Sequence, residues 1–149
     1  MATPDRARRR RGPGRKRVPY LFVPSAVYLC GPINGCTDEE CKDWRAAAKA
    51  ALPKTVDPMR RDYRGREDEC VQEIVVSDKA DIDGCRALLV NYDRPSVGTS
   101  MEVLYAWERG KKVVVVAKKG TKLSPWLRYH ATVIVDSFAL AFKVLGDTR

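Results

Sequence analysis

The sequence predicts a Rossmann-like (flavodoxin-like) α/β domain, in which helices cover both faces of a parallel five-stranded sheet and so form three layers. Short, continuous apolar runs are typical of strands that are buried on both faces. Segments with helical patterns separate these runs, and this alternation favours parallel pairing. The 149 residues are enough for one hydrophobic core, and they contain no internal repeat.

Five segments have the pattern of strands. Residues 26–30 and 87–92 are apolar enough to lie inside the sheet, and the valines of 112–117 form the clearest strand in the chain. The strands expected in chain order are residues 26–30, 54–56, 87–92, 112–117 and 133–135.

Helices are expected between these strands, and several have recognisable ends. Thr37 precedes three acidic residues, which suits a helix start, and Pro53 ends this helix. Ser124 followed by Pro125 is a typical start for a short helix, and Ser137 can cap the last one. The expected helices are residues 37–52, 67–84, 99–109, 123–129 and 137–145.

The helix at residues 67–84 contains an acidic residue within its apolar stripe. Spacings of three and four place Val71, Ile74, Val75, Asp78 and Ile82 on one face, which we expect to pack against the sheet. A carboxylate on a packed face must be paired, hydrated or functional, because burying it without a partner is costly. Asp78 is therefore a candidate site residue.

Residues 93–106 have the features of a ligand site. A turn of small polar residues joins the strand at 87–92 to a helix, so free backbone N–H groups lie at the carboxyl edge of the sheet, where α/β proteins bind anions. Glu102 follows this turn. Its spacing from Thr99 also fits a capping box, and spacing alone favours this structural role over a catalytic one.

A second candidate for ligand contact is the loop at residues 59–66, which contains four arginines and a tyrosine. Arginines near a ligand edge can clamp an anion. For each single arginine, a solvated surface position is an equally good interpretation.

The positive charge is concentrated at the N-terminus. Residues 1–17 contain eight Arg or Lys and one Asp, so +7 of the formal charge of +9 lies there. We expect residues 1–24 to be a basic, disordered tail and residues 25–149 to be the folded domain. Such a tail can contact nucleic acid, but a solvated arm is the favoured interpretation.

Cysteine and histidine usage argues against a disulfide framework and a zinc site. The five cysteines are odd in number and include no C-x-x-C pair, and there is one histidine. We therefore expect reduced thiols in a cytoplasmic protein, with Cys30 and Cys85 in the core and with no metal or organic cofactor. No apolar run approaches the ~20 residues of a membrane span, and residues 20–23 are too few for a signal peptide.

Three segments resemble the nucleoside 2-deoxyribosyltransferase superfamily, which also contains 2′-deoxynucleoside 5′-phosphate N-hydrolases and CMP-type N-glycosidases. The segments are V-Y-L-C-G-P-I at 27–33, S-D-K-A-D-I-D-G-C at 77–85 and P-S-V-G-T-S-M-E-V-L-Y-A at 95–106. The similarity extends over about residues 26–145, and its most specific part is G-x-x-x-E. This resemblance favours a catalytic role for Glu102 over the capping role that spacing alone favours.

The resemblance implies three catalytic residues. Glu102 is expected to be a nucleophile that traps C1′ of the sugar as a glycosyl ester. Asp78 is expected to contact the base as acid and base, and Tyr28 to orient nucleophile and sugar, with core packing as its alternative. The residues expected to bind substrate are Gly31, Ile33, Asn34, Asp57, Arg60, Ser96, Gly98, Thr99 and Ser124.

Two departures from the transferases favour a phosphorylated substrate. Transferases that act on free nucleosides usually carry an aspartate where Ser96 stands, and they use a chain-terminal aromatic carboxylate that this chain lacks. A serine beside a helix N-terminus suits a 5′-phosphate. Ser124 matches a phosphate contact that reaches across a dimer interface.

We therefore expect a homodimer, with sites at its interface, that hydrolyses the N-glycosidic bond of a (2′-deoxy)nucleoside 5′-monophosphate to free base and sugar 5-phosphate. One alternative is a deoxyribosyltransferase that exchanges bases between nucleosides. A second is a non-catalytic nucleotide-binding module. The sequence leaves open which base is released, and whether the sugar is ribose or deoxyribose.

Overall fold

The computed structural model describes residues 25–146 and shows one all-parallel sheet. Its strand order, β2-β1-β3-β4-β5, is that of a flavodoxin-like fold and confirms the prediction. The expected basic tail at residues 1–24 lies outside the described residues. The strands are β1 (Ala26–Cys30), β2 (Thr55–Val56), β3 (Cys85–Asn91), β4 (Lys112–Val116) and β5 (Val133–Val135).

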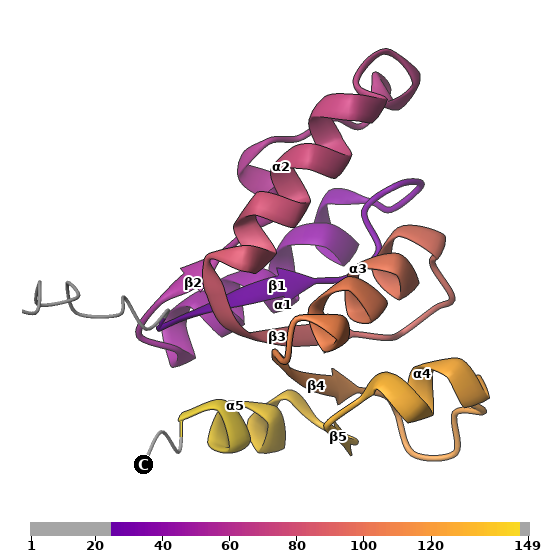
Figure 1. Cartoon of the computed structure of the whole chain (residues 1–149). Helices are drawn as coiled ribbons and strands as arrows, with labels where there is room; N and C mark the ends of the chain where they lie inside the picture. Colours follow the sequence, from indigo (N-terminus) through magenta and orange to yellow (C-terminus); the bar gives the residue numbers. More distant parts are fainter. Residues whose placement is uncertain (1–24, 147–149) are drawn as a thin grey trace, which may run out of the picture.

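Helices cover both faces of the sheet, so the three predicted layers are present (Figure 1). Two helices pack on one face and three on the other, each burying apolar side chains against the strands. The first pair is α1 (Asp38–Ala51) and α5 (Phe138–Gly146); the second group is α2 (Val71–Asp83), α3 (Val97–Glu108) and α4 (Pro125–His130). Short 3₁₀ helices, η1 (Pro58–Arg60) and η2 (Glu67–Glu69), precede α2.

The alternation of side chains along β1 decides which residues reach the functional side of the sheet. Val27 and Leu29 pack under α1 and α5, whereas Tyr28 and Cys30 belong to the core cluster on the α2–α3 side. All four are buried. The strand therefore presents a phenol and a thiol, two residues apart, toward the helix that carries Glu102.

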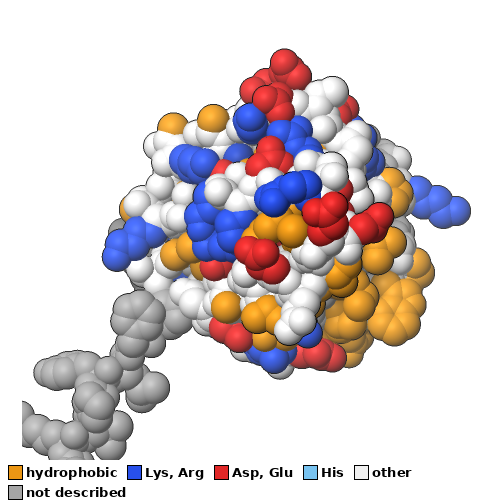
Figure 2. All heavy atoms as spheres, turned by 90° about the horizontal axis from the view of Figure 1, so that it is seen from above, with side chains coloured by type: hydrophobic (Ala, Val, Ile, Leu, Met, Phe, Trp, Pro, Cys, Tyr) orange, Lys and Arg blue, Asp and Glu red, His pale blue; other side chains and the backbone are white. Residues whose placement is uncertain are grey.

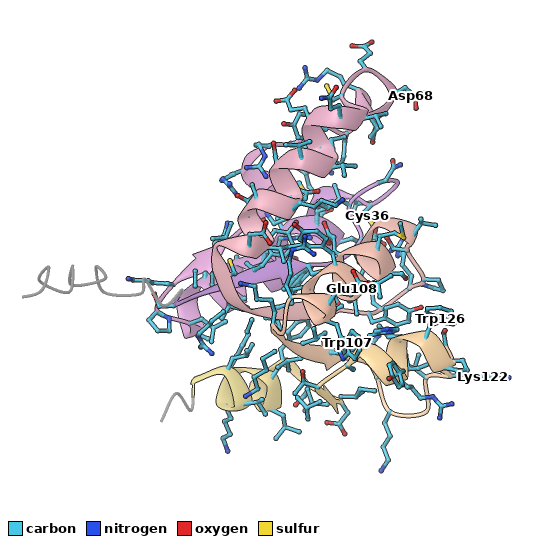
Figure 3. The ribbon with its side chains drawn as sticks, in the orientation of Figure 1. Cys36, Asp68, Trp107, Glu108, Lys122 and Trp126 are labelled. Atoms are coloured by element: carbon cyan, nitrogen blue, oxygen red, sulfur yellow. The ribbon has the colours of Figure 1, made fainter. Side chains whose placement is uncertain are left out.

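The predicted packing of α2 is wrong for most of its length. Only Ile82 of the apolar stripe is buried, while Val71 is 60% and Val75 is 47% exposed. The N-terminal half of α2 projects beyond the sheet, and Asp68 lies just before it at the far end of this projection (Figure 3). The stripe lacks a strand to pack on there, and its side chains instead face the hollows described below.

The start of α3 also differs from the prediction. The N-cap is Ser96, whose Oγ accepts a hydrogen bond from the Thr99 N–H at 3.3 Å. Ser96 and Thr99 both suit a cap, but the helix begins with the earlier one. The capping box between Thr99 and Glu102 does not form, so the Glu102 carboxylate is available for other partners.

A buried arginine on α1 fixes the loops beside the carboxyl end of β1. The Arg45 guanidinium donates to the carbonyl oxygens of Cys41 at 2.6 Å and Gly31 at 3.1 Å, and lies 3.4 Å from the Asp57 carboxylate. Asp57 also accepts from the Met59 N–H at 2.9 Å and pairs with Lys49. These contacts link α1, the loop after β1 and the start of η1.

Replacing Arg45 with methionine is expected to lower the free energy of unfolding by about 3 kcal/mol, because Asp57 then keeps a buried charge without its buried partner. The half-exposed Lys49 is the matched control: Lys49→Met should cost less than about 1 kcal/mol. Urea denaturation of both variants measures the difference. Equal losses of unfolding free energy in the two variants would show that the buried Arg45–Asp57 pair stabilises the fold no more than the Lys49–Asp57 pair does.

Candidate active site

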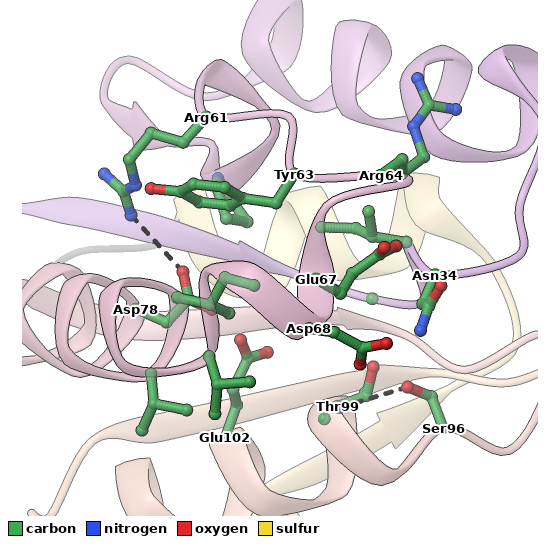
Figure 4. A pocket seen from close by; sticks show the side chains of 17 residues that line it. Asn34, Arg61, Tyr63, Arg64, Glu67, Asp68, Asp78, Ser96, Thr99 and Glu102 are labelled. Carbon is green, nitrogen blue, oxygen red and sulfur yellow. Dashed lines mark hydrogen bonds and ion pairs between the residues drawn. The ribbon is translucent and has the colours of Figure 1, made fainter.

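A pocket of about 340 Å³ opens at the carboxyl ends of β1 and β3, where the strand order reverses. Its walls come from the loop after β1, the η1–η2 segment, α2 and the N-terminus of α3 (Figure 4). Eight of the predicted site residues line it: Gly31, Ile33, Asn34, Asp78, Ser96, Gly98, Thr99 and Glu102.

Glu102 lies at the base of this pocket, with a hydrogen-bond donor on each carboxylate oxygen. The Tyr28 hydroxyl donates to Oε1 at 3.0 Å, and the Cys30 thiol donates to Oε2 at 2.9 Å. Both donors come from β1, so the strand fixes the plane of the carboxylate. Burial raises the pKa values of Tyr28 and Cys30, which keeps both groups protonated as donors.

The Glu102 carboxyl ionises near neutral pH. Burial raises its pKa to about 7, and the neighbouring charge of Asp78 acts in the same direction. The hydrogen bonds from Cys30 and Tyr28, and the charge of Arg45, act against this rise. A carboxylate with little water around it is a stronger nucleophile than a solvated one, because fewer hydrogen bonds must break before it attacks.

Asp78, on α2, points into the same part of the pocket as Glu102 (Figure 4). Burial raises its pKa, while the Arg61 guanidinium, 3.4 Å away, opposes the rise. Arg61 also pairs with Asp81 at 2.5 Å, which holds it at the rim. Because Asp78 and Glu102 influence each other, their protons belong to the pair, and one shared proton gives one acid and one base.

The other end of the pocket is suited to an anion. At the start of α3, the N–H groups of Val97 and Gly98 have no intrahelical acceptor by position, and no atom lies within 4 Å of where a Cβ on Gly98 would be. Within residues 25–146, Thr99 Oγ1 at this end and Arg61 Nε at the Asp78 end are buried and have no hydrogen-bond partner. Such orphaned polar atoms beside a pocket are groups that a ligand can satisfy.

Three predicted substrate-binding residues lie outside the pocket, and two of them, Asp57 and Arg60, are held by ion pairs. Asp57 is buried between Arg45 and Lys49 and caps η1, so its role is structural. Arg60 turns away and pairs with Asp81 at 2.7 Å, while Arg61 and Arg64 line the pocket. An irregular loop has no periodicity, so the sequence does not indicate which of its arginines face inward.

Ser124 lies at a distance from the pocket in its own chain. It caps α4 by accepting from the Trp126 N–H at 3.1 Å and lines a separate hollow between α3 and α4. Its predicted phosphate contact therefore requires a second copy of the chain.

Other residues at the site were not predicted individually, although the loop at residues 59–66 was a candidate for ligand contact. Cys30 was assigned only to the core, although its position two residues after Tyr28 on a strand places it on the same face. The remaining lining residues lie on the η1–η2 segment or on α2, and sequence patterns do not show which side chains of these segments face the pocket. They are Pro58, Arg61, Tyr63, Arg64, Glu67, Asp68, Val71, Ile74 and Val75.

An apolar groove between α2 and α3 adjoins the pocket through Asp78 and Glu102. It continues toward α4, where Trp126 is 72% and Tyr129 is 70% exposed. Trp107 and Trp126 lie at this side of the molecule in Figure 3, and apolar side chains gather at the corresponding edge of Figure 2. The site therefore borders an extensive apolar surface.

Across residues 25–146, no group of three His, Cys, Asp or Glu side chains is arranged to hold a metal ion. In the same range, no helix is long and apolar enough to cross a membrane.

The family model for nucleoside 2-deoxyribosyltransferase matches residues 27–145. The chain belongs to this family. The match includes Tyr28, Asp78 and Glu102, the three residues that the fold brings together. No curated protein matches the chain.

Solved structures share the family fold at low sequence identity. A 2-deoxyribosyltransferase from Bacillus psychrosaccharolyticus has a TM-score of 0.64 at 14% identity, covering 83% of this chain and 92% of its own. A conserved protein from Enterococcus faecalis V583 has a TM-score of 0.65 at 10% identity, covering 83% and 98%. The CMP N-glycosidase BcmB from Clostridium botulinum has a TM-score of 0.53 at 17% identity, covering 81% and 98%.

Glu102→Gln in this family member is expected to stabilise the fold at alkaline pH. The folded-state pKa of about 7 lies above the ordinary value of 4.5, so the wild type loses stability as pH rises from about 4.5 to 7. The loss is on the order of 3 kcal/mol by linkage, and glutamine does not titrate. Urea denaturation at pH 5 and pH 8 should show that the free energy of unfolding of the variant, relative to wild type, is higher at pH 8 than at pH 5.

The control for this measurement is Glu108→Gln, an exposed glutamate on the same helix. It should show no pH-dependent gain. A Glu102→Gln effect of the same size at both pH values would mean that the carboxylate is not destabilised by its surroundings.

Proposed function

We propose that this protein hydrolyses the N-glycosidic bond of a (2′-deoxy)nucleoside 5′-monophosphate, releasing the free base and the sugar 5-phosphate. The observation that carries the proposal is the Glu102 carboxylate, held by one donor on each oxygen in a pocket that also contains the Asp78 carboxyl and an open helix N-terminus. Family membership supports a reaction at the glycosidic bond, because the structural relatives include a 2-deoxyribosyltransferase and a CMP N-glycosidase.

In the first step, a Glu102 oxygen attacks C1′ of the sugar as the bond from C1′ to the base nitrogen breaks. The bonding electron pair leaves with the base, and protonated Asp78 supplies the proton that the base takes up. The product is a glycosyl ester on Glu102, a free base and an Asp78 carboxylate. The step needs the state in which the proton of the pair is on Asp78 and Glu102 is ionised; burial raises the pKa of Asp78 in this direction.

In the second step, water attacks C1′ and the ester bond to Glu102 breaks. Asp78, now a carboxylate, takes a proton from the water, and Glu102 leaves as a carboxylate. Both side chains return to their starting states, and the sum is one nucleotide plus one water giving base and sugar phosphate. The Tyr28 hydroxyl keeps the Glu102 side chain oriented in both steps.

The donors at the start of α3 favour a 5′-phosphate over a 5′-hydroxyl at this end of the pocket, and they act against the charge of the nearby Asp68 carboxylate (Figure 4). The Ser96 side chain and the N–H groups of Val97 and Gly98 can act together on an anion, and the dipole of α3 favours negative charge there. Asn34, from the loop after β1, lines the same pocket and adds an uncharged donor.

We also propose that the active form is a homodimer in which Ser124 completes the phosphate site of the neighbouring copy. The exposed apolar side chains of α3 and α4 support this assembly, since a surface of that kind beside a pocket is typical of an interface. The Ser124 hydroxyl lies at the start of α4, within this apolar region.

A deoxyribosyltransferase that moves the sugar from one base to another is the alternative reaction. It shares the glycosyl–Glu102 step and differs only in whether water or a second base accepts the sugar. A panel of nucleosides and their 5′-monophosphates, assayed for base release with and without an acceptor base, distinguishes the two. Base release from a monophosphate without any acceptor supports hydrolysis; release that requires an acceptor base supports transfer.

Ser96→Asp is expected to reduce kcat/KM for a nucleoside 5′-monophosphate by at least about a hundredfold. Losing the hydroxyl donor to a charged group costs about 1.5–3 kcal/mol, and the like charge placed against the phosphate adds to this loss. Aspartate still caps α3, so the fold should be retained. Activity on the unphosphorylated nucleoside should fall much less or rise.

The matched control is Ser137→Asp, which changes the capping serine of α5 on the opposite face of the sheet. It should leave both activities unchanged. Equal losses on nucleotide and nucleoside for Ser96→Asp would show that Ser96 does not recognise the phosphate, and the transferase reaction would then become the better proposal.

A further inference from the structure

The nucleophile has an unusual partner, a buried thiol. The Cys30 Sγ lies 2.9 Å from Glu102 Oε2 and 3.8 Å from the backbone carbonyl oxygen of Thr99, one turn earlier on α3. The side chain is fully buried in the core cluster on the α2–α3 side of the sheet. One S–H proton thus has two acceptors within reach, one charged and one neutral.

The chemistry of the thiol limits what it can do there. Burial and the neighbouring Glu102 charge raise its pKa, so it remains an S–H group and acts as a donor. A thiolate would be needed for nucleophilic or metal-binding roles. A hydrogen bond to the carboxylate is therefore the function that remains for it.

The two donors on Glu102 differ in strength. A phenol is a strong donor and a thiol a weak one, so Tyr28 and Cys30 stabilise the charged carboxylate to different extents although both contacts are close to 3 Å. The other charged groups that act on Glu102 are Asp78 from α2 and Arg45 from α1. Within residues 25–146, Tyr28 and Cys30 are the hydrogen-bond donors to this carboxylate.

We propose that Cys30 is a positioning residue for Glu102, a weak donor that holds Oε2 while the carboxylate is charged and turns its proton to the Thr99 carbonyl when Glu102 becomes neutral. Glu102 becomes neutral on protonation or, under the function proposed above, as the glycosyl ester. The second acceptor means that no buried donor is left unsatisfied after this change, which would otherwise cost stability in the intermediate.

The alternative is that Cys30 only fills space in the core. Cys85 provides the comparison, because it is fully buried in the same cluster, at the start of β3, and its pKa is raised chiefly by burial. Glu102 is absent from the groups that act on Cys85. Replacing Cys85 therefore removes a buried thiol of the same cluster without touching the carboxylate.

The test is a direct titration of Glu102 by NMR, on protein labelled with ¹³C at the glutamate carboxyl carbons. The signal is assigned by its loss in Glu102→Gln. Relative to wild type, Cys30→Ala should raise the pKa of Glu102 by about half to one unit, because the charged form loses a donor. Cys30→Ser should lower it, because a hydroxyl is the stronger donor. Cys85→Ala and Cys85→Ser should leave it unchanged.

Alanine and serine differ by one hydroxyl, so their comparison isolates the donor from the loss of volume. The same Glu102 pKa in wild type, Cys30→Ala and Cys30→Ser would overturn the proposal. If Cys30→Ala does not fold, Cys30→Ser decides alone: a lower pKa than wild type supports the role, and an unchanged or higher one overturns it.

The titration uses no substrate, so its outcome is independent of the proposed reaction. The expected order of pKa values in a protein that releases no base would support the role of Cys30 and refute the hydrolase function. An active enzyme in which Glu102 has the same pKa in wild type and all Cys30 variants would support the hydrolase function and refute the role of Cys30. In an active enzyme, the apparent pKa of the acid limb in the pH profile of kcat should increase from Cys30→Ser through wild type to Cys30→Ala.

Discussion

Holding the Glu102 carboxylate in a pocket with little water requires donors at fixed positions, and β1 supplies both of them. Tyr28 and Cys30 reach the two oxygens because they are two residues apart on a strand, which places them on the same face of the sheet. A shift of one residue in β1 would turn both to the other face. The pairing of β1 with β3, Tyr28 opposite Leu88, therefore determines the geometry of the site as well as the order of the sheet.

The burial of the Glu102 carboxylate also explains why charged residues such as Arg45 and Arg61 lie close to the site. A carboxylate whose pKa is raised destabilises the fold above neutral pH, and enzymes often accept such a cost where chemistry needs it. Arg45 lowers this cost through its charge and also ties the loop at Gly31 to α1. Arg61 pairs with both Asp78 and Asp81 at the rim, which keeps the Asp78 carboxyl in the part of the pocket that contains Glu102.

The sequence predicted the layers, the strand and helix positions and the residues at the strand ends, because burial and local patterns determine these. It did not predict that the Val71 and Val75 side chains of α2 are exposed, since amphipathic spacing does not reveal where the sheet ends. It placed the cap of α3 at Thr99 instead of Ser96, because both residues suit a cap. The inward-facing arginines are Arg61 and Arg64, not Arg60, because the loop conformation decides which side chains face the pocket and no sequence periodicity reports it. Cys30 is a different case. Alternation along β1 already indicates that Cys30 lies on the same face as Tyr28, and what the sequence does not show is that this face meets Glu102 on α3.

Family membership supports a reaction at a glycosidic bond. The reaction, its acceptor and its substrate are proposals, and the central one is that Glu102 becomes covalently attached to the sugar. The most direct measurement is intact-protein and peptide mass spectrometry after acid quenching of a reaction with a 2′-deoxy-2′-fluoro nucleoside 5′-monophosphate, in which fluorine slows breakdown of the ester. We predict a mass increase equal to the fluorinated sugar phosphate minus one water on the peptide that contains Glu102, and none in Glu102→Gln. An adduct on any other residue, or turnover of the substrate by Glu102→Gln at the wild-type rate, would contradict this account.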